Sequence, residues 1–535
     1  MGGVNNEATS LPSTAAETEE MSEGQPLGDR VNNRSQRPSS EAFKEFMASG
    51  WAERSAELPP RSAVAGYARQ RRLALSRRFP GERLVIPAGP LKVRSNDTDY
   101  RFRPHSGFAH MTGLGLDHEP DAVLVLEPVA EGTGDDGGNH AATLYFRPLA
   151  GTDSEEFYSN ARYGSFWIGD RLNLAEVSAM LDLPTRHLDE AETAIAGNVG
   201  EPAFGGVSVR LLRKVDEMVD ALVDTVRYNT APDPENLDLG VFDARDDELA
   251  EALSELRLVK DEWEIQQMRE AVAATVNGFT EVVKALPRAI THPRGERVVE
   301  GVFFARAREE GNDLGYDTIA AAGNNATVLH WIRNNGQVRA GELLLLDAGV
   351  EAESLYTADI TRTLPVNGRY TDVQRRVYQA VLDAADAGFA AAVPGAKFRD
   401  VHAAAVRVLA ERLAEWGVLP VPLEEALSDA GQQHRRWMPH GTSHHLGLDV
   451  HDCAQARRDL YLDGTITEGM VFTIEPGLYF KEEDLTVPEE YRGIGVRIED
   501  DVLITADGPV NLSSALPRTP DEVEDWMAGI YAADQ

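Results

Sequence analysis

Four histidines lie close together in the segment HGTSHHLGLDVHD, at positions 440 to 452, in a chain that has only 13 histidines. They are His440, His444, His445 and His451. Imidazole changes its charge near neutral pH and is the commonest metal-binding side chain in proteins. The segment therefore predicts proton-transfer chemistry, a metal site, or both, and a metal site would need further ligands elsewhere in the chain.

Four acidic residues within or beside short apolar runs are the candidates for those ligands. They are Asp347 (LLLLDAG), Asp359 (DITRT), Glu475 (MVFTIEPGLY) and Glu499 (GVRIEDDVLIT). Each has an ordinary explanation when taken alone: a strand end for Asp347, a Pro-Gly turn for Glu475, an ion pair with Arg497 for Glu499. An unpaired charge in a buried strand is costly, so four such acids in one region favour a shared purpose. Carboxylates and imidazole together suit Mn²⁺, Fe²⁺, Co²⁺ or Zn²⁺.

The elements that would hold these acids are strands alternating with helices. Strand-like runs cover 341–350, 360–366, 470–480 and 495–505. Helical periodicity begins at Asp261, which with Glu264 has the spacing of a capping box, and Pro287 is predicted to stop this helix. Further helices are predicted over 297–311, from Thr371 with Gln374 as its capping partner, and over 398–417. Strand runs with separate helices indicate an α+β arrangement.

The N-terminal half has a different pattern. Residues 1–40 are rich in small and polar residues, which predicts a disordered tail. Short apolar runs at 83–89, 121–128 and 142–148 predict buried strands, and a helical pattern follows around 208–226. We therefore predict a separate α/β domain over residues 41–245 and a second domain over 246–535.

Composition excludes several classes of partner. The 88 acidic residues against 52 Lys and Arg give a net charge of −36, which disfavours nucleic acid and anionic membranes. No apolar run is long enough to span a bilayer. The single cysteine, Cys453, suits a reducing compartment, and we expect a cytoplasmic protein. Cys453 is expected to be a small buried residue and not a metal ligand.

Several motifs together resemble those of aminopeptidase P, the Xaa-Pro aminopeptidase among the pita-bread metallopeptidases. They are LLLDAG, ADITRTLPVNGRYT, HGTSHHLGLDVHD, TIEPGLY and YRGIGVRIEDD, and the likeness covers about residues 255 to 525. RSNDTDYRFRPHSGFAHMTGL and EPDAVLVLEP are similar to the creatinase-type N-terminal domain of that family. The resemblance implies an α+β pita-bread catalytic domain preceded by an α/β creatinase-type domain.

The resemblance also implies a site for two divalent metal ions. Matched motif by motif, Asp347 binds one ion, Asp359 and Glu499 bridge the two, and His444 and Glu475 complete the other. Mn²⁺ is the favoured ion, with Zn²⁺ or Co²⁺ as alternatives. Divalent ions polarise a scissile carbonyl and make hydroxide available near neutral pH.

The remaining histidines receive roles from the same resemblance. His330 (in TVLHWIRNNG) and His451 assist the substrate carbonyl and the tetrahedral intermediate, and His440 lines the pocket near the leaving proline. In an extended segment neighbouring side chains point to opposite faces, so His445 is expected to point away from His444 and either to pack or to support the ligands from behind. His402 falls in a helical pattern and is expected to lie at the surface or in packing.

Three further residues have expected supporting roles. Glu475 is expected to carry a proton between the attacking water and the leaving nitrogen. Arg497 is expected to orient Glu499 or Asp359, with a simple strand ion pair as the alternative. Tyr479 either donates a hydrogen bond in the site or packs.

One feature departs from the family pattern. Eleven residues separate Asp347 from Asp359, where the family usually has ten. The additional residue falls in EAESLY, and a bulge or a longer turn is expected to absorb it without moving the two aspartates.

The predicted function is removal of the N-terminal residue from peptides with proline at position 2. Prolidase, which cleaves only Xaa-Pro dipeptides, is the close alternative, and a catalytically silent binding module is the more distant one. Metal-free creatine hydrolysis on the same fold is disfavoured because all five ligand positions have ligand-type residues. A homo-oligomer, dimer or tetramer, is expected from the resemblance alone.

Overall fold

The computed structural model describes residues 40–533 except 97, 116–119, 153, 201–202, 204 and 235–238. The predicted disordered tail, residues 1–40, lies outside the described residues apart from Ser40. Ser40 caps the first helix, because its side chain accepts a hydrogen bond from the Phe43 amide. Among the described residues, no helix combines the length and the apolar character that crossing a bilayer requires.

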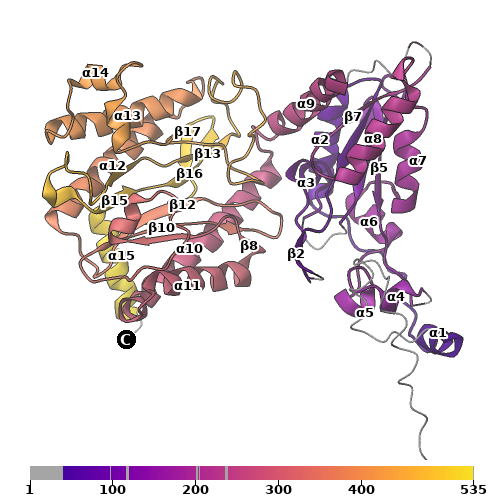
Figure 1. The fold of residues 1–535 in the computed structure, drawn as a ribbon, viewed down its shortest axis with the longest axis horizontal. Helices are drawn as coiled ribbons and strands as arrows, with labels where there is room; N and C mark the ends of the chain where they lie inside the picture. Colours follow the sequence, from indigo (N-terminus) through magenta and orange to yellow (C-terminus); the bar gives the residue numbers. More distant parts are fainter. Residues whose placement is uncertain are drawn as a thin grey trace, which may run out of the picture. The chain divides into compact units, whose positions relative to one another are not determined.

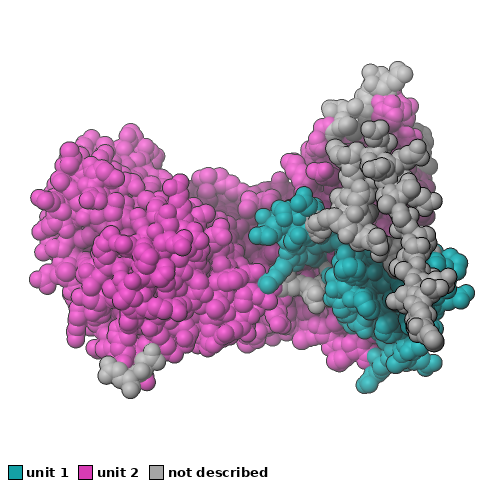
Figure 2. Space-filling view, turned by 60° about the horizontal axis from the view of Figure 1, so that its bottom comes forward, with its two compact units in different colours: residues 1–57, 91–102, 148–173 teal, residues 58–90, 103–147, 174–535 magenta. Residues whose placement is uncertain are grey.

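The chain divides into two compact units, which Figure 2 shows in different colours. Unit 1 consists of the described parts of residues 1–57, 91–102 and 148–173. Aromatic side chains build it: Phe157 meets Trp51 and Phe166 edge-on, at ring-centroid distances of 5.3 and 5.6 Å. Its elements are α1 (Glu41–Ala48), β2 (Val93–Ser95), β3 (Thr98–Asp99), α4 (Glu156–Ser159) and α5 (Ser165–Ile168).

Unit 2 comprises residues 58–90, 103–147 and 174–535, and its N-terminal part contains a five-stranded mixed sheet. The strand order is β6-β5-β4-β1-β7, with parallel pairing at both edges and antiparallel pairing between. Its strands are β1 (Glu82–Pro87), β4 (Val123–Pro128), β5 (His140–Phe146), β6 (Thr185–His187) and β7 (Ser208–Leu211). The helices are α2 (Val64–Arg78), α3 (Ser106–Thr112), α6 (Leu174–Leu181), α7 (Ala191–Ala196), α8 (Glu217–Thr230) and α9 (Leu239–Glu255). The three predicted strands are thus confirmed.

The helical pattern predicted around 208–226 is only half right. Residues 208–211 form β7, which pairs in parallel with β1, and the helix begins only at Glu217. Asp216 marks the true start, because its side chain accepts hydrogen bonds from the Met218 and Val219 amides. Tertiary pairing with β1 therefore overrides the apparent helical period in the first residues of this segment.

Four long helices form the frame of the C-terminal part of unit 2. They are α10 (Glu262–Thr291), α11 (Gly295–Glu310), α12 (Asp372–Ala391) and α13 (Phe398–Glu415). Figure 1 shows the pair α10 and α11 on one side of the strands and the pair α12 and α13 on the other. Capping boxes start α10 at Asp261 with Glu264 and α12 at Thr371 with Gln374, as predicted.

Pro287 does not stop α10, contrary to the prediction. The helix continues to Thr291 with Pro287 inside it. A proline removes one backbone hydrogen bond, but the helix face around it is buried: Leu286 and Ala289 are 0% exposed. Tertiary packing therefore holds the last turn in place.

The strands between the helices form several small antiparallel sheets. One has the order β12-β10-β9 and another the order β13-β16-β17, and β14 pairs with β15 and β11 with β8. The strands are β8 (Asp313–Leu314), β9 (Ile319–Ala322), β10 (Leu343–Ala348), β11 (Val350–Glu351), β12 (Ile360–Pro365), β13 (Val471–Ile474), β14 (Gly477–Phe480), β15 (Ile494–Arg497), β16 (Asp500–Thr505) and β17 (Gly508–Asn511). Two further helices are α14 (Leu423–Leu427) and α15 (Pro520–Ala533).

Candidate metal centre

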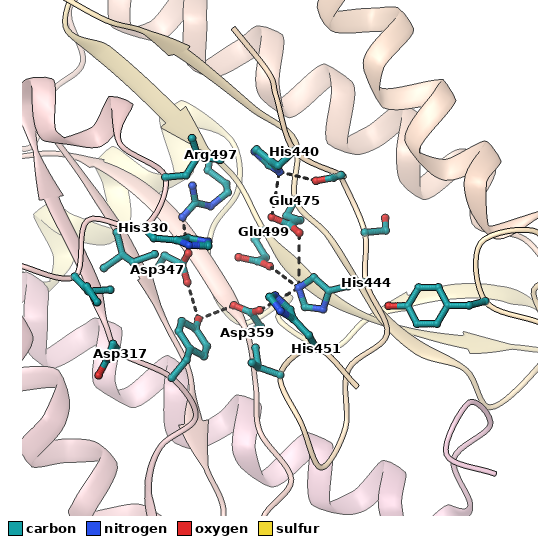
Figure 3. A pocket seen from close by; sticks show the side chains of 18 residues that line it. Asp317, His330, Asp347, Asp359, His440, His444, His451, Glu475, Arg497 and Glu499 are labelled. Carbon is teal, nitrogen blue, oxygen red and sulfur yellow. Dashed lines mark hydrogen bonds and ion pairs between the residues drawn. The ribbon is translucent and has the colours of Figure 1, made fainter. Parts of the chain in front are cut away.

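A cavity of about 600 Å³ opens in the C-terminal part of unit 2, and the predicted site residues line it. All five predicted metal ligands and the four predicted assisting residues are among its lining residues (Figure 3). They are Asp347, Asp359, His444, Glu475 and Glu499, with His330, His440, His451 and Arg497. Side chains that are up to 169 positions apart in the sequence therefore face one space.

The acids come from the ends and breaks of paired strands. Asp347 lies in β10 opposite Thr361 of β12, and Asp359 directly precedes β12. Glu475 follows β13, and Glu499 falls between β15 and β16, where its amide donates to the Thr361 carbonyl over 3.1 Å. Each of the two glutamates thus interrupts its apolar run, as the sequence indicated, and the interruption turns its side chain into the cavity.

His444 is the centre of the arrangement. Its Nε2 lies 3.3 Å from Asp359 Oδ2, 3.7 Å from Glu475 Oε1 and 4.0 Å from Glu499 Oε1. Its Nδ1 lies 3.2 Å from the His445 carbonyl oxygen, which directs Nε2 to the acids. Ligand atoms of Asp359, His444 and Glu499 all fall within 4.8 Å of one another, a donor set of two carboxylates and one imidazole that fits a divalent cation.

The acids affect one another's protonation because they are buried and crowded. Burial raises the pKa of Glu475, His444 and Arg497 lower it, and the result is a pKa of about 7. Burial and the charges of Asp359 and Glu475 raise the pKa of Glu499 well above its usual range. Burial alone would lower the pKa of His444, but the hydrogen bond that its ring donates to Asp359 and the Glu475 charge raise it to about 9. The protein thus leaves negative charge here incompletely balanced, which favours a bound cation.

Arg497 balances one of the acids directly. It forms an ion pair with Asp347 and donates through Nε to Thr361 Oγ1 over 3.2 Å. Thr361 in turn donates to Glu499 Oε2 over 2.7 Å. The direct acidic partner of Arg497 is thus Asp347, which the sequence did not indicate, and Arg497 reaches Glu499, one of the two predicted partners, through the Thr361 hydroxyl.

A chain of hydrogen bonds fixes the ring of His440. Arg497 Nη1 donates to the Tyr479 hydroxyl over 3.0 Å, and the hydroxyl lies 2.8 Å from His440 Nε2. His440 Nδ1 lies 2.5 Å from the Gly441 carbonyl oxygen. Because Arg497 can only donate, the Tyr479 proton is free to go to Nε2, and His440 carries its own proton on Nδ1. Burial and the Arg497 charge lower the pKa of His440 to about 3, so the ring is neutral.

The other histidines divide between the cavity and the interior. The His451 ring stands edge-on to the His444 ring at 4.4 Å, and His330 lines the same cavity. His445 is completely buried and stacks on Phe398 at 4.7 Å, so the packing role predicted for it is confirmed. His402 does not line the cavity, and Cys453, also buried, is not among the lining residues.

Sequence reasoning also missed Tyr316 and Asp501, which contact the candidate ligands. The Tyr316 hydroxyl lies 2.6 Å from Asp347 Oδ1 and 2.5 Å from Asp359 Oδ1, although its one proton can serve only one of them at a time. The Asp501 carboxylate accepts from the Asp359 amide over 3.2 Å. Asp501 stands inside an apolar strand, so the rule that identified Glu499 would also have found it; Tyr316 gave no comparable signal.

The segment between Asp347 and Asp359 turns back on itself where the additional residue falls. The Ala352 amide donates to the Tyr356 carbonyl over 2.9 Å, and Leu355 has a φ of 73°. The two aspartates nevertheless meet at the Tyr316 hydroxyl. A longer turn therefore accommodates the residue, as expected.

A buried arginine joins these strands to the end of the chain. Arg362, only 1% exposed, donates to the Glu499 carbonyl over 2.7 Å and to Asp500 over 2.6 Å. Its Nε donates to the Pro517 carbonyl over 2.9 Å. The backbone that carries Glu499 is thus fixed by residues near the C-terminal end.

Comparison with known proteins supports the assignment of both the N-terminal part and the catalytic part. The family model described as metallopeptidase family M24 matches residues 266–506, and the model described as the aminopeptidase P N-terminal domain matches residues 68–202. One match covers four of the five strands of the N-terminal sheet, and the other covers the strands that carry the candidate ligands. The predicted creatinase-type N-terminal part and pita-bread catalytic part are confirmed.

Whole-chain relatives extend the match. The chain is 50% identical over 525 residues to Xaa-Pro aminopeptidase 1 of Streptomyces coelicolor, covering 98% of each chain. It is 32% identical to Xaa-Pro aminopeptidase of Escherichia coli, covering 86% of this chain and 97% of the relative. A solved Escherichia coli aminopeptidase P variant in complex with substrate matches with a TM-score of 0.71 and 29% identity, covering 89% of this chain and all of that one. The chain therefore belongs to metallopeptidase family M24, in the group of aminopeptidase P enzymes.

Proposed function

We propose that this metallopeptidase hydrolyses the bond between the N-terminal residue and a proline at position 2 of peptides. The observation that carries the proposal is the convergence of five ligand-type side chains with His330, His440, His451 and Arg497 around one cavity. Relatives with this domain arrangement bear the name Xaa-Pro aminopeptidase.

We further propose two divalent ions in this cavity, with Mn²⁺ favoured. Asp347 would hold one ion, Asp359 and Glu499 would lie between the two, and His444 with Glu475 would hold the other. When bound, the ions supply an activated water and polarise the scissile carbonyl. The oxygen-rich donor set with one imidazole supports Mn²⁺ over softer alternatives, although Zn²⁺ and Co²⁺ have suitable chemistry as well.

The chain's own groups would handle the substrate and its protons. Glu475, whose Oε2 lies 3.7 Å from His440 Nδ1, would carry the proton from the attacking water to the leaving proline nitrogen. His330 and His451 would donate to the substrate carbonyl as negative charge develops on its oxygen. Both nitrogens of His440 are engaged, by Tyr479 and by Gly441, so its ring offers a face against which the proline ring could pack.

Three broader properties remain proposals from the sequence. The resemblance supports a dimer or tetramer. The single, buried Cys453 is compatible with a cytoplasmic location. The domain boundaries at residues 41, 245 and 246 stay a proposal, and the two family matches, which fall on either side of residue 245, support the division there.

The test uses chelator-treated protein with Ala-Pro-Ala and with Ala-Pro, with and without Mn²⁺, and measures free alanine. Metal-dependent release from the tripeptide is the expected result. Release from the dipeptide alone would identify a prolidase, and no release with Mn²⁺, Co²⁺ or Zn²⁺ would favour a binding module. Glu524→Gln is a control variant and should release alanine as the wild type does. Glu524 is a buried carboxylate that does not line the cavity, and it is held by Arg369, Arg375 and the Tyr370 amide.

A further inference from the structure

One wall of the cavity is an irregular segment that carries His330. Residues 323–336 follow β9 and contain a short 3₁₀ turn (Gly323–Thr327), after which residues 328–336 form neither helix nor strand. Leu329, His330 and Ile332 of this segment line the cavity. A segment without a ladder of backbone hydrogen bonds needs other interactions to keep a catalytic side chain in place.

A single buried carboxylate supplies those interactions. Glu296, in the first turn of α11, is 0% exposed. Its Oε1 accepts from the Ala322 amide over 2.9 Å and from Asn325 Nδ2 over 2.8 Å. Its Oε2 accepts from Trp331 Nε1 over 2.8 Å and from the Gly336 amide over 2.6 Å.

The four donors are distributed along the segment. They lie just before its start, within its 3₁₀ turn, beside His330 and at its end. All four are uncharged N–H groups, so the carboxylate acts here as a four-fold hydrogen-bond acceptor and not as a member of an ion pair. A carboxylate accepts at both oxygens, whereas an amide accepts at only one.

The partners of Glu296 are closely packed around its carboxylate. A Cβ on Gly336 would lie 2.5 Å from Asn325 Nδ2 and 2.7 Å from Glu296 Oε2. The Glu296 amide donates to the Gly336 carbonyl over 3.2 Å, which closes a ring of hydrogen bonds between the two residues. The buried Asn334 adds bonds from the Ala320 amide and to the Thr318 carbonyl, over 3.0 and 2.7 Å.

We propose that Glu296 is a positioning residue, whose buried carboxylate sets the fold of residues 323–336 and thereby holds His330 toward the substrate carbonyl. Glu296 does not line the cavity, so its effect on catalysis passes through this segment. The catalytic part of the inference rests on the role proposed above for His330. The conformational part does not.

Glu296→Gln is the first test, because it keeps the size of the side chain but points an NH₂ group at two N–H donors. We expect amide hydrogen exchange across residues 322–336 to become at least about tenfold faster, since the segment opens locally. Exchange in β13 and β16, which carry neither Glu296 nor His330, should not change. This readout needs no catalysis, so it remains decisive even if the wild-type protein releases no alanine, which is the failure of the proposed function. Unchanged exchange in residues 322–336 would overturn the proposal.

The second test is a double-mutant cycle with His330→Ala, measured on Ala-Pro-Ala at saturating metal. We expect Glu296→Gln to lower kcat by about 10- to 100-fold, as displacement of a catalytic group does, with a smaller change in KM. In the His330→Ala background the same substitution should have less than about a threefold effect, because the group that Glu296 positions is already gone. Equal losses in both backgrounds, or full activity of His330→Ala, would overturn the positioning role.

Two further variants separate positioning from general loss of stability. Glu524→Gln removes another buried carboxylate, whose hydrogen-bond partners Arg369, Tyr370 and Arg375 lie outside the segment, and should leave kcat unchanged at temperatures where the protein is folded. Trp331→Phe deletes one of the four donors while keeping an aromatic ring, and we expect an intermediate loss of kcat with the wild-type metal content. If Glu524→Gln lowers kcat as much as Glu296→Gln, the effect is one of stability and the proposal fails.

Discussion

Two groups of buried carboxylates in unit 2 differ in how the protein balances their charge. The acid cluster comprises Asp347, Asp359, Glu475 and Glu499 at the cavity, and its cationic neighbours are Arg497 and His444. The second group, here named the matched cluster, comprises Glu264 and Asp452 with Arg71, Arg257 and Lys260. Asp347, Asp359, Glu499, Glu264 and Asp452 are buried, whereas the Glu475 side chain is 17% exposed at the cavity.

The matched cluster contains at least one cation for each acid. Arg257 Nε donates to Asp452 Oδ1 over 2.8 Å, and Lys260 Nζ lies 3.5 Å from Asp452 Oδ2. Arg71 Nη2 lies 3.6 Å from Glu264 Oε2, and the Tyr356 hydroxyl donates to Glu264 Oε1 over 2.7 Å. Because α2 carries Arg71 and α10 carries Glu264, this cluster ties the N-terminal sheet's helices to the catalytic part within the same unit.

The pKa shifts of the two clusters run in opposite directions. Burial would raise the pKa of Asp452, but Arg257 and Lys260 bring it below its usual range. Burial would likewise raise the pKa of Glu264, and His110, Arg71 and Lys260 lower it. At the cavity, burial and neighbouring acids raise the pKa of Glu499 instead. An acid whose charge is matched by protein cations holds the structure together, whereas acids left short of cations are equipped to bind a metal ion.

The largest expected effect comes from removing a carboxylate at the cavity. Glu499→Gln should lower kcat/KM by at least about 10³-fold, because it removes an oxygen proposed to lie between two ions. The metal-free variant should be more resistant to urea than the metal-free wild type at pH 8. An acid whose pKa is raised in the folded state lowers the stability of that state as the pH rises, and the variant lacks this acid. Steady-state rates and urea unfolding of the metal-free proteins measure the two quantities. A metal-free variant that is less stable than wild type would show that the acid cluster is balanced after all.

Removing a carboxylate from the matched cluster should have the opposite effect on stability. Asp452→Asn leaves Arg257 and Lys260 buried without their acid, and we expect a loss of about 3–5 kcal/mol in the free energy of unfolding. The metal content of the folded protein should stay at the wild-type level. Asp521→Asn, which breaks the exposed pair with Arg375, is the control and should cost less than about 1 kcal/mol. A loss no larger than that of the control would mean that the cluster is not structural.

The smallest effect concerns pH. His110 is buried, its Nε2 lies 3.3 Å from Glu264 Oε1, and burial lowers the pKa of His110 to about 4 despite that neighbour. Since its folded pKa lies below its ordinary value of 6.5, the unfolded chain binds the extra proton, and stability is lost as the pH falls from 6.5 toward 4. His110→Gln should reduce this loss by at most about 3 kcal/mol.

Urea unfolding of wild type and His110→Gln at several pH values gives the two slopes. The exposed His187 provides the control, because His187→Gln should leave the slope unchanged. If the free energy of unfolding depends on pH in the same way in wild type and in His110→Gln, then His110 does not contribute to the acid sensitivity of the protein.

The acids at the cavity were predictable because a charged residue stands out within an apolar run of the sequence. A carboxylate such as Asp347 after four leucines conflicts with the apolar pattern around it, and only a specific partner resolves the conflict. The same reasoning identified the strand breaks at Glu475 and Glu499. The capping boxes of α10 and α12 were equally readable, because both depend on residues three positions apart.

The remaining features depend on contacts between distant segments, which one sequence does not show. Glu296 looks like an ordinary acid in the first turn of a helix, and Arg497 shows no preference for Asp347 over Glu499. The sequence predicts a helix end at Pro287, because a proline inside a helix raises the free energy of that helix. The packing that offsets this cost involves residues elsewhere in the fold. Strand β7 was read as helix for the same reason, since its partner β1 lies over 100 residues earlier.

The contacts of Arg362 imply an order of events during synthesis. The chain emerges from its N-terminal end, and the N-terminal sheet is available to fold first. Arg362 holds the backbone beside Glu499 and also donates to the Pro517 carbonyl, so its full set of contacts can form only after nearly the whole chain has left the ribosome. We therefore expect a chain truncated before residue 517 to be less active than the full chain, even though every proposed ligand is present.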